Sequence, residues 1–291
     1  MINWIMKKAG DKALKVDVGK LDLTRLPEEV TEINDISYME DDLPGHKLDI
    51  YIRKDGKKKP ILIDIHGGGF ISEDKAMNRL FGNYMAKLGF VVFEINFRIA
   101  YPEWTVFDQI TDIDRAVRFV LDNAESYECD KDQLYIAGHS SGGVLAVSEA
   151  LLCVDPEMRS AYGIEDRDYS YKGIITDCGL LHFYKSSIAY WGMRKMCFPK
   201  GYKNDKRYGY LKFEDNACLK KLPKLALMTN HKDVLRKMTY YFDKILEIKI
   251  IAHKLFIYGP DGHTGIIFVP YKIPNMSTLK AVSEYLGVRF G

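Results

Sequence analysis

The sequence predicts an α/β fold in which helices cover both faces of a mostly parallel central sheet. One observation is a set of short runs rich in Ile, Val, Leu and Phe without polar alternation, as in strands covered on both faces: 61–65, 90–95, 134–137, 173–176, 225–228 and 255–258. The other is helical periodicity between these runs, clearest at 110–121, where apolar residues form one stripe beside charged ones. Alternating strands and helices favour a parallel sheet, with reactive groups on loops at the carboxyl ends of the strands.

The composition suits one domain. The chain has 291 residues, of which 47% are hydrophobic and 28% charged, and we expect residues 1–291 to form a single α/β unit. The stretch at about 182–215 departs from the pattern because it is crowded with Tyr, Trp, Phe, Lys and Gly and lacks a clean period. It is interpreted as an inserted lid. The N-terminal segment 1–45 is a candidate to pack with this lid.

The charge pattern argues against nucleic acid as a partner. The 42 basic and 40 acidic side chains leave a net charge of +2, too little for a strong attractive field. One short basic cluster, 57–59, follows Asp55-Gly56 and is expected to be a solvated hairpin turn rather than a phosphate-binding patch. Charged residues interrupt the first fifteen positions, so we expect neither a signal peptide nor a membrane span, and we expect a cytoplasmic location.

Cysteine usage indicates reduced thiols. The five cysteines are odd in number, widely spaced and free of C-x-x-C pairs. Zinc sites built from soft ligands need clustered Cys and His, and here these residues are scattered. The sequence therefore predicts no metal and no other cofactor, and it leaves the oligomeric state open. The cysteines are Cys129, Cys153, Cys178, Cys197 and Cys218.

A candidate nucleophile follows the apolar run 134–137. Residues 138–143 have the sequence G-H-S-S-G-G and lead into an apolar helical segment. A serine hydroxyl needs a base and must stand clear of the sheet to reach a carbonyl carbon. In a sharp strand-to-helix turn, glycines at 138 and 142 avoid a clash between a β-carbon and the neighbouring backbone. This context favours Ser140 as the nucleophile over a simple glycine-capped loop.

A glycine loop follows the run 61–65. His66 is followed by Gly67, Gly68, Gly69 and Phe70, so several backbone N–H groups are left uncovered. Such donors stabilise an oxyanion that forms on a substrate, and the N–H of Ser141 is a further donor. A phosphate-binding loop is less consistent, because the sequence lacks G-x-G-x-x-G spacing and a Lys-Ser/Thr pair.

These motifs, together with Asn96-Phe97-Arg98 and Tyr101-Pro102, resemble the α/β-hydrolase esterases related to hormone-sensitive lipase and to bacterial acetyl-esterase and feruloyl-esterase-type enzymes. The resemblance spans roughly 48–265. The chain departs from the family at Phe97, where Tyr is usual, and at His139, where many relatives have Asp. The G-H-S-S-G-G form leans toward acetyl esterases and formamidases.

Position and the resemblance together select His263 as the base. It follows the run 255–258 in a loop near the end of the chain, at the sheet edge where the nucleophile is expected. His66 is expected to orient the glycine loop. The remaining histidines are less well placed: His46, His139, His182, His231 and His253.

A carboxylate must fix the imidazole tautomer and stabilise its cation. Asp233 follows the run 225–228, and its D-x-L-R surroundings match the acid loop of the family. The order Ser140, Asp233, His263 is the one that this fold uses. Asp177 and Asp261 are competing carboxylates, and Asp233 could instead cap the helix that follows it.

Four further residues are expected to contact substrate: Phe70, His139, Trp104 and Trp191. The aromatic side chains of the lid could wall an acyl or aryl pocket, although ordinary lid packing explains them equally well. The sequence thus predicts a serine hydrolase whose partner is a small carboxylic ester, with short-chain or acetyl esters favoured. The alternatives are an amidase or formamidase using the same triad, and a catalytically inactive binding protein on this fold.

Overall fold

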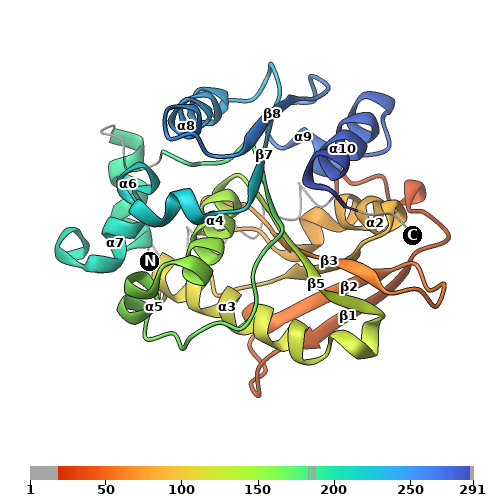
Figure 1. Cartoon of the computed structure of the whole chain (residues 1–291), viewed down its shortest axis with the longest axis horizontal. Coiled ribbons are helices and arrows are strands. Elements are labelled where there is room, and N and C mark those ends of the chain that lie inside the picture. The colour runs from red at the N-terminus through yellow and green to blue at the C-terminus, as the bar shows by residue number, and fades with distance from the viewer. Residues whose placement is uncertain (1–18, 183, 185–187, 289–291) are drawn as a thin grey trace.

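The computed structural model describes residues 19–182, 184 and 188–288. In this part of the chain, the strands form one eight-stranded sheet in the order β1-β2-β4-β3-β5-β6-β7-β8 (Figure 1). The strands are β1 (Thr31–Ser37), β2 (Lys47–Ile52), β3 (Lys59–Ile65), β4 (Val91–Ile95), β5 (Cys129–His139), β6 (Gly173–Asp177), β7 (Lys224–Thr229) and β8 (His253–Ile257).

The six strands from β3 to β8 run parallel, as predicted. Each of them overlaps one of the six apolar runs, and β3, β4 and β6 are buried along their whole length. The N-terminal strands β1 and β2 were not anticipated. They add an antiparallel pair, with β1 on β2 and β2 on β4.

Helices cover both faces of the sheet (Figure 1). One face carries α3, α4 and α8, and the other carries α2, α9 and α10, because the side chains of these helices divide between two separate buried clusters. The helices are α2 (Arg79–Leu88), α3 (Val106–Asp122), α4 (Ser141–Val154), α5 (Pro156–Tyr162), α6 (Ile188–Cys197), α7 (Lys206–Tyr210), α8 (Arg236–Ile248), α9 (Gly265–Phe268) and α10 (Ile273–Leu286). Short 3₁₀ turns are η1 (Leu23–Arg25), η2 (Pro44–His46), η3 (Lys75–Asn78), η4 (Ala124–Tyr127), η5 (Tyr202–Asn204), η6 (Phe213–Asp215) and η7 (Ala217–Lys221).

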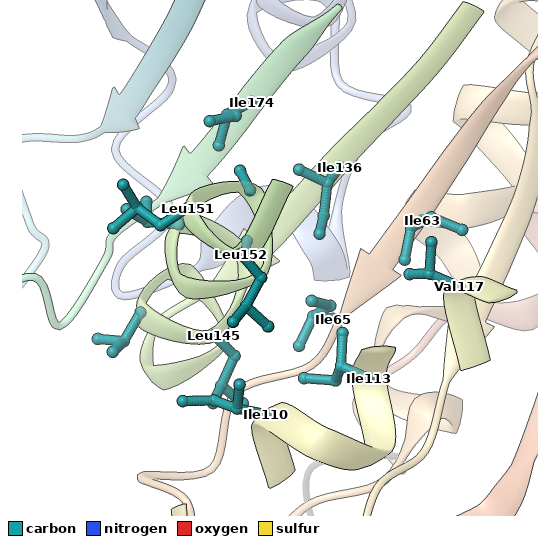
Figure 2. Close-up of a cluster of buried hydrophobic side chains, with 14 of the residues drawn as sticks. Ile63, Ile65, Ile110, Ile113, Val117, Ile136, Leu145, Leu151, Leu152 and Ile174 are labelled. Atoms are coloured by element: carbon teal, nitrogen blue, oxygen red, sulfur yellow. The ribbon is translucent and has the colours of Figure 1, made fainter. Parts of the chain in front are cut away.

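The core under α3 and α4 fixes the position of the strand ends. Figure 2 shows side chains from β3, β5 and β6 packed against both helices, with Ile136 of β5 facing Leu152 of α4 and Ile63 of β3 beside Val117 of α3. Every one of these side chains is fully buried. Because alternate residues of a strand point to opposite faces, Leu62 joins the other cluster. The central strands are therefore held from both sides.

The hairpin expected at Asp55-Gly56 is wrong. A hairpin would pair β2 with β3, but β4 lies between these two strands. Nor is the basic cluster wholly solvated, because Lys59 is 4% exposed and its ammonium group donates to Asp55 and Glu128. A turn dipeptide indicates a local reversal of the chain but does not determine which strand the chain joins next.

The segment 182–215 contains α6, η5, α7 and η6 in its described residues. Phe198, Tyr208 and Phe213 are buried in the same cluster as α3 and α4. Of the N-terminal segment, residues 1–18 lie outside the described part, and 31–37 form β1 at the edge of the sheet. All five cysteines are free thiols. Among the described helices, none has both the length and the apolar character needed to cross a bilayer.

Candidate active site

Ser140 lies in the sharp turn between β5 and α4. Its backbone has a φ of 53°, a left-handed value that is uncommon for a residue with a side chain. The turn is so tight that a β-carbon on Gly142 would lie 2.3 Å from the carbonyl oxygen of Ile65, and one on Gly138 would lie 2.2 Å from that of Gly142. Glycine is therefore required at both positions, as the sequence indicated.

The structure brings Ser140, His263 and Asp233 into a hydrogen-bonded series. The Nε2 atom of His263 is 2.9 Å from Oγ of Ser140, and its Nδ1 atom is 2.7 Å from Oδ1 of Asp233. The three residues follow β5, β8 and β7, whose carboxyl ends meet at one edge of the sheet. Thus three loops far apart in the sequence meet at one point.

Asp233 is held in its ionised form. Burial alone would raise its pKa, but hydrogen bonds from His263, the Leu235 N–H and the Thr229 hydroxyl hold the pKa below its ordinary value. An ionised carboxylate accepts the Nδ1–H of His263, which selects the tautomer of the neutral ring whose Nε2 can accept the proton of Ser140. This arrangement can activate a serine hydroxyl.

The glycine loop lies beside the nucleophile. Gly68 has a φ of 90°, and a β-carbon there would lie 2.0 Å from the carbonyl oxygen of Ser72, so the loop can fold this way only with glycine. Ser141 opens α4, and the first N–H groups of a helix lack an intrahelical acceptor. Its hydroxyl accepts the N–H of Phe70 at 3.2 Å, which ties the two motifs together.

A cavity of about 210 Å³ joins these groups. Glycines 67–69 line it together with His139, Ser140 and His263, so the glycine loop and the reacting hydroxyl face one space. Ser141, the fourth candidate oxyanion donor, is fully buried and is not among these lining residues. Four lining residues were not anticipated from the sequence: Ser72, Glu73, Thr264 and Ile267. Glu73 and Thr264 have φ values of 75° and 49°. Their place next to a recognised motif was the one signal that could have identified them.

The competing carboxylates are engaged elsewhere. Asp261 accepts hydrogen bonds from Lys272 and Asn275, and Asp177 accepts one from His139. Neither of them is hydrogen-bonded to His263. His66 packs against Phe97 with nearly parallel rings, and burial lowers the pKa of His66 to about 4, so its ring is neutral.

The aromatic residues expected to contact substrate are not among the described residues that line the cavity. Phe70 is fully buried and belongs to the core cluster. Trp104 lies under the Arg98 guanidinium, and Trp191 is 52% exposed beside Lys195. Their residue type suggested an apolar wall, whereas the backbone directs their side chains into the core or onto cationic neighbours.

His139 is among the residues that line the cavity, but its side chain is buried. The residue is 1% exposed, and its two ring nitrogens lie 3.1 Å from Asp64 and 3.0 Å from Asp177, both of which are fully buried. Burial opposes a charge on the ring, yet the two carboxylates raise the pKa of His139 to about 10. The ring is therefore an imidazolium beneath the nucleophile turn.

Among the described residues, one group brings metal-ligand atoms close together: Cys178, Asp233 and His263. Two of its members already bind one another in the series that leads to Ser140. Burial raises the pKa of the third, Cys178, far above its ordinary value, which disfavours the thiolate that a metal needs. This group is therefore better suited to proton transfer than to holding a metal.

The charge on His139 predicts a pH-dependent stability. The group has a pKa of about 10 in the folded chain and about 6.5 when unfolded, so its contribution is complete below pH 6.5 and is lost as pH rises toward 10. The expected slope reaches about 1.4 kcal/mol per pH unit in urea unfolding experiments across this window. Ring ¹⁵N chemical shifts, assigned with His139→Gln, provide the control. A neutral ring at about pH 8.5 would contradict the expectation.

Solved structures share this fold. Esterase B from Lactobacillus rhamnosis matches with a TM-score of 0.85 at 20% identity, covering 96% of this chain and 92% of that one. An esterase from the archaeon Pyrobaculum calidifontis matches with a TM-score of 0.74 at 19% identity, covering 97% and 92%. The chain therefore has the α/β-hydrolase fold.

Curated relatives match over a shorter region. The probable isoprenylcysteine alpha-carbonyl methylesterase ICME of Oryza sativa is 33% identical over 38% of this chain and 27% of its own length. The probable carboxylic ester hydrolase LipM of Mycobacterium tuberculosis is 31% identical over 62% of this chain and 41% of its own length. The chain thus covers less than half of either relative. The BD-FAE family model matches residues 48–193, half of the chain and the half that holds both glycine-rich motifs, so the chain belongs to the BD-FAE family.

Proposed function

We propose that this chain is a serine hydrolase that cleaves carboxylic esters through an acyl-enzyme on Ser140. The observation that carries the proposal is the continuous series of hydrogen bonds from the Ser140 hydroxyl through His263 to the buried Asp233. The names of the relatives, a probable methylesterase and a probable carboxylic ester hydrolase, support the same class of reaction.

In the proposed acylation, Oγ of Ser140 attacks the ester carbonyl carbon while Nε2 of His263 takes its proton. The carbonyl π electrons move to the oxygen, which accepts hydrogen bonds from N–H groups of the glycine loop and Ser141. The carbonyl re-forms, the bond to the leaving oxygen breaks, and His263 gives its proton to the departing alcohol. Asp233 stabilises the imidazolium between these two steps.

In the proposed deacylation, water attacks the acyl carbon and His263 takes a proton from it. A second tetrahedral oxyanion forms and collapses. The bond from the acyl carbon to Oγ breaks, His263 returns the proton to Ser140, and the carboxylic acid leaves. No group beyond ester, water and these side chains is required by this sequence of steps.

The substrate is proposed to have a short acyl chain. The cavity of about 210 Å³ is smaller than the pockets of about 300–1,000 Å³ that hold drug-sized ligands.

We propose that the segment 182–215 caps this site, because Sγ of Cys197, at the end of α6, lies 3.8 Å from the carbonyl oxygen of Gly69. The five free thiols favour a reducing, cytoplasmic location.

The first kinetic prediction concerns the nucleophile. Ser140→Ala is expected to lower kcat for p-nitrophenyl acetate by about a millionfold, because loss of a triad member has an effect of this size in serine enzymes. Ser126, an exposed serine in η4, provides the matched control, and Ser126→Ala should keep full activity. A fluorophosphonate probe should label Ser126→Ala as it labels wild type, and it should not label Ser140→Ala. Equal activity of both variants would exclude Ser140 as the nucleophile.

A second prediction distinguishes Asp233 from Asp261 as the carboxylate that supports the base. Asp233→Asn should lower kcat by about 10⁴-fold, because an amide cannot hold the imidazole in the required tautomer or stabilise its cation. Asp261 also lies on the histidine loop, but its carboxylate is bound to Lys272 and Asn275. Asp261→Asn should therefore lower kcat by less than about tenfold. Steady-state kinetics of both variants measures the difference. The reverse order would reassign the acid.

The third prediction concerns the acyl chain. If the small cavity holds the acyl group, kcat/KM for p-nitrophenyl acetate or butyrate should exceed that for the dodecanoate by about tenfold or more, since even one methylene that a pocket does not accommodate lowers specificity by about 10-fold or more. Formanilide belongs in the same panel, because faster turnover of the amide would favour the formamidase alternative. A preference for the dodecanoate would contradict the proposed short-chain specificity.

A further inference from the structure

The His139 ring joins three neighbouring strands below the nucleophile. Asp64 lies on β3, His139 ends β5 and Asp177 ends β6, and these strands are adjacent in the sheet. Both ring nitrogens donate, because each faces a carboxylate oxygen at 3.0–3.1 Å in a fully buried setting. Phe81 of α2 packs edge-on against the ring, with centroids 4.6 Å apart. The ring therefore has a single orientation.

Asp177 also holds the nucleophile directly. Its carboxylate accepts from His139, while its backbone carbonyl accepts the N–H of Ser140 at 2.9 Å. Two consecutive residues of the turn are thus bound by one residue of β6. A strained left-handed backbone such as that of Ser140 persists only where its surroundings fix it from several sides.

The next residue, Cys178, extends these contacts to the loop that carries the base. Its Sγ atom lies 3.4 Å from the N–H of Thr264 and 3.2 Å from the hydroxyl oxygen of Tyr258. Thr264 directly follows His263 in the sequence. The dipeptide Asp177-Cys178 therefore contacts both sides of the reacting pair, the turn of Ser140 and the loop of His263.

We infer that His139 is a positioning residue: held between Asp64 and Asp177, it fixes the dipeptide that sets Ser140 against His263. The inference rests on the proposed function. Both ring nitrogens bind carboxylates, so the ring acts on the nucleophile through Asp177. A displacement of about 1 Å at a reacting group can lower a rate by about a hundredfold, so a loosened contact of this kind is measurable in kcat.

The alternative is that His139 only stabilises the fold, since removing one member of a buried charged group is destabilising in itself. Lys59 provides a matched control at the opposite ends of the same strands. It is 4% exposed at the start of β3 and binds Asp55 and Glu128, the second of which precedes β5. Lys59→Gln and His139→Gln both remove a buried cation and leave two carboxylates behind.

The experiment compares kcat and KM for p-nitrophenyl acetate, and the rate of fluorophosphonate labelling, well below the melting temperature of each variant. His139→Gln should lower kcat and the labelling rate by about 10- to 100-fold and leave KM within about twofold. Lys59→Gln should lose thermal stability and keep kcat within about twofold.

A folded His139→Gln protein with wild-type kcat would overturn the inference, as would an equal loss of kcat in the Lys59 variant. If His139→Gln does not fold, the single variant Asp64→Asn provides the test. The inference requires this variant to lose about threefold or more in kcat with KM unchanged, and an unchanged kcat would contradict the inference. Failure of the proposed function looks different, because wild type itself would then escape labelling or be labelled as fast as Ser140→Ala.

Discussion

The left-handed backbone of Ser140 is the constraint on which the rest of the site depends. It allows the chain to leave β5 and enter α4 within one residue, and it sets the hydroxyl clear of the sheet. The surroundings must hold this conformation, because a strained residue of this kind costs about 1–3 kcal/mol. Glycine at 138 and 142 removes the clashes, and the carbonyl of Asp177 holds the Ser140 N–H. A nearly fully buried α4 then anchors the turn from the other side.

The parallel part of the sheet could be predicted from sequence because its apolar runs show no polar alternation, and β3, β4 and β6 are indeed buried along their whole length. The antiparallel strands carried a weaker signal. In β2, Asp49 interrupts the apolar pattern, and its burial is possible because Lys75, from a distant segment, lies 2.7 Å away. In β1, half-buried and exposed positions alternate irregularly around a bulge near Asp35. Neither the ion pair of Asp49 nor the bulge in β1 can be recognised before the chain is folded.

The site residues also divide into those that the sequence predicts and those that it does not. Ser140 and the glycine loop are local motifs, in which a few consecutive residues determine the conformation. The geometry of His263 and Asp233 follows from the rule that strand ends meet at one edge. His139 could not be understood from its neighbours, because what defines it is a carboxylate on each side, from strands that lie 75 and 38 positions away. Adjacency to the nucleophile suggested contact with substrate, whereas the pleat turns that side chain into the core.

The proposed catalytic groups lie at different places in the sheet, Ser140 near its centre and His263 at its edge. Ser140 follows a strand flanked on both sides, while His263 follows β8, which lies at the edge of the sheet formed by residues 31–257 and whose Ile257 side chain is exposed. Marginal strands open locally at a lower free energy than central ones. Fraying of this margin would separate the imidazole from the hydroxyl while the core stays intact. Thermal inactivation and melting are therefore distinct events in this architecture, and the first is expected at the lower temperature.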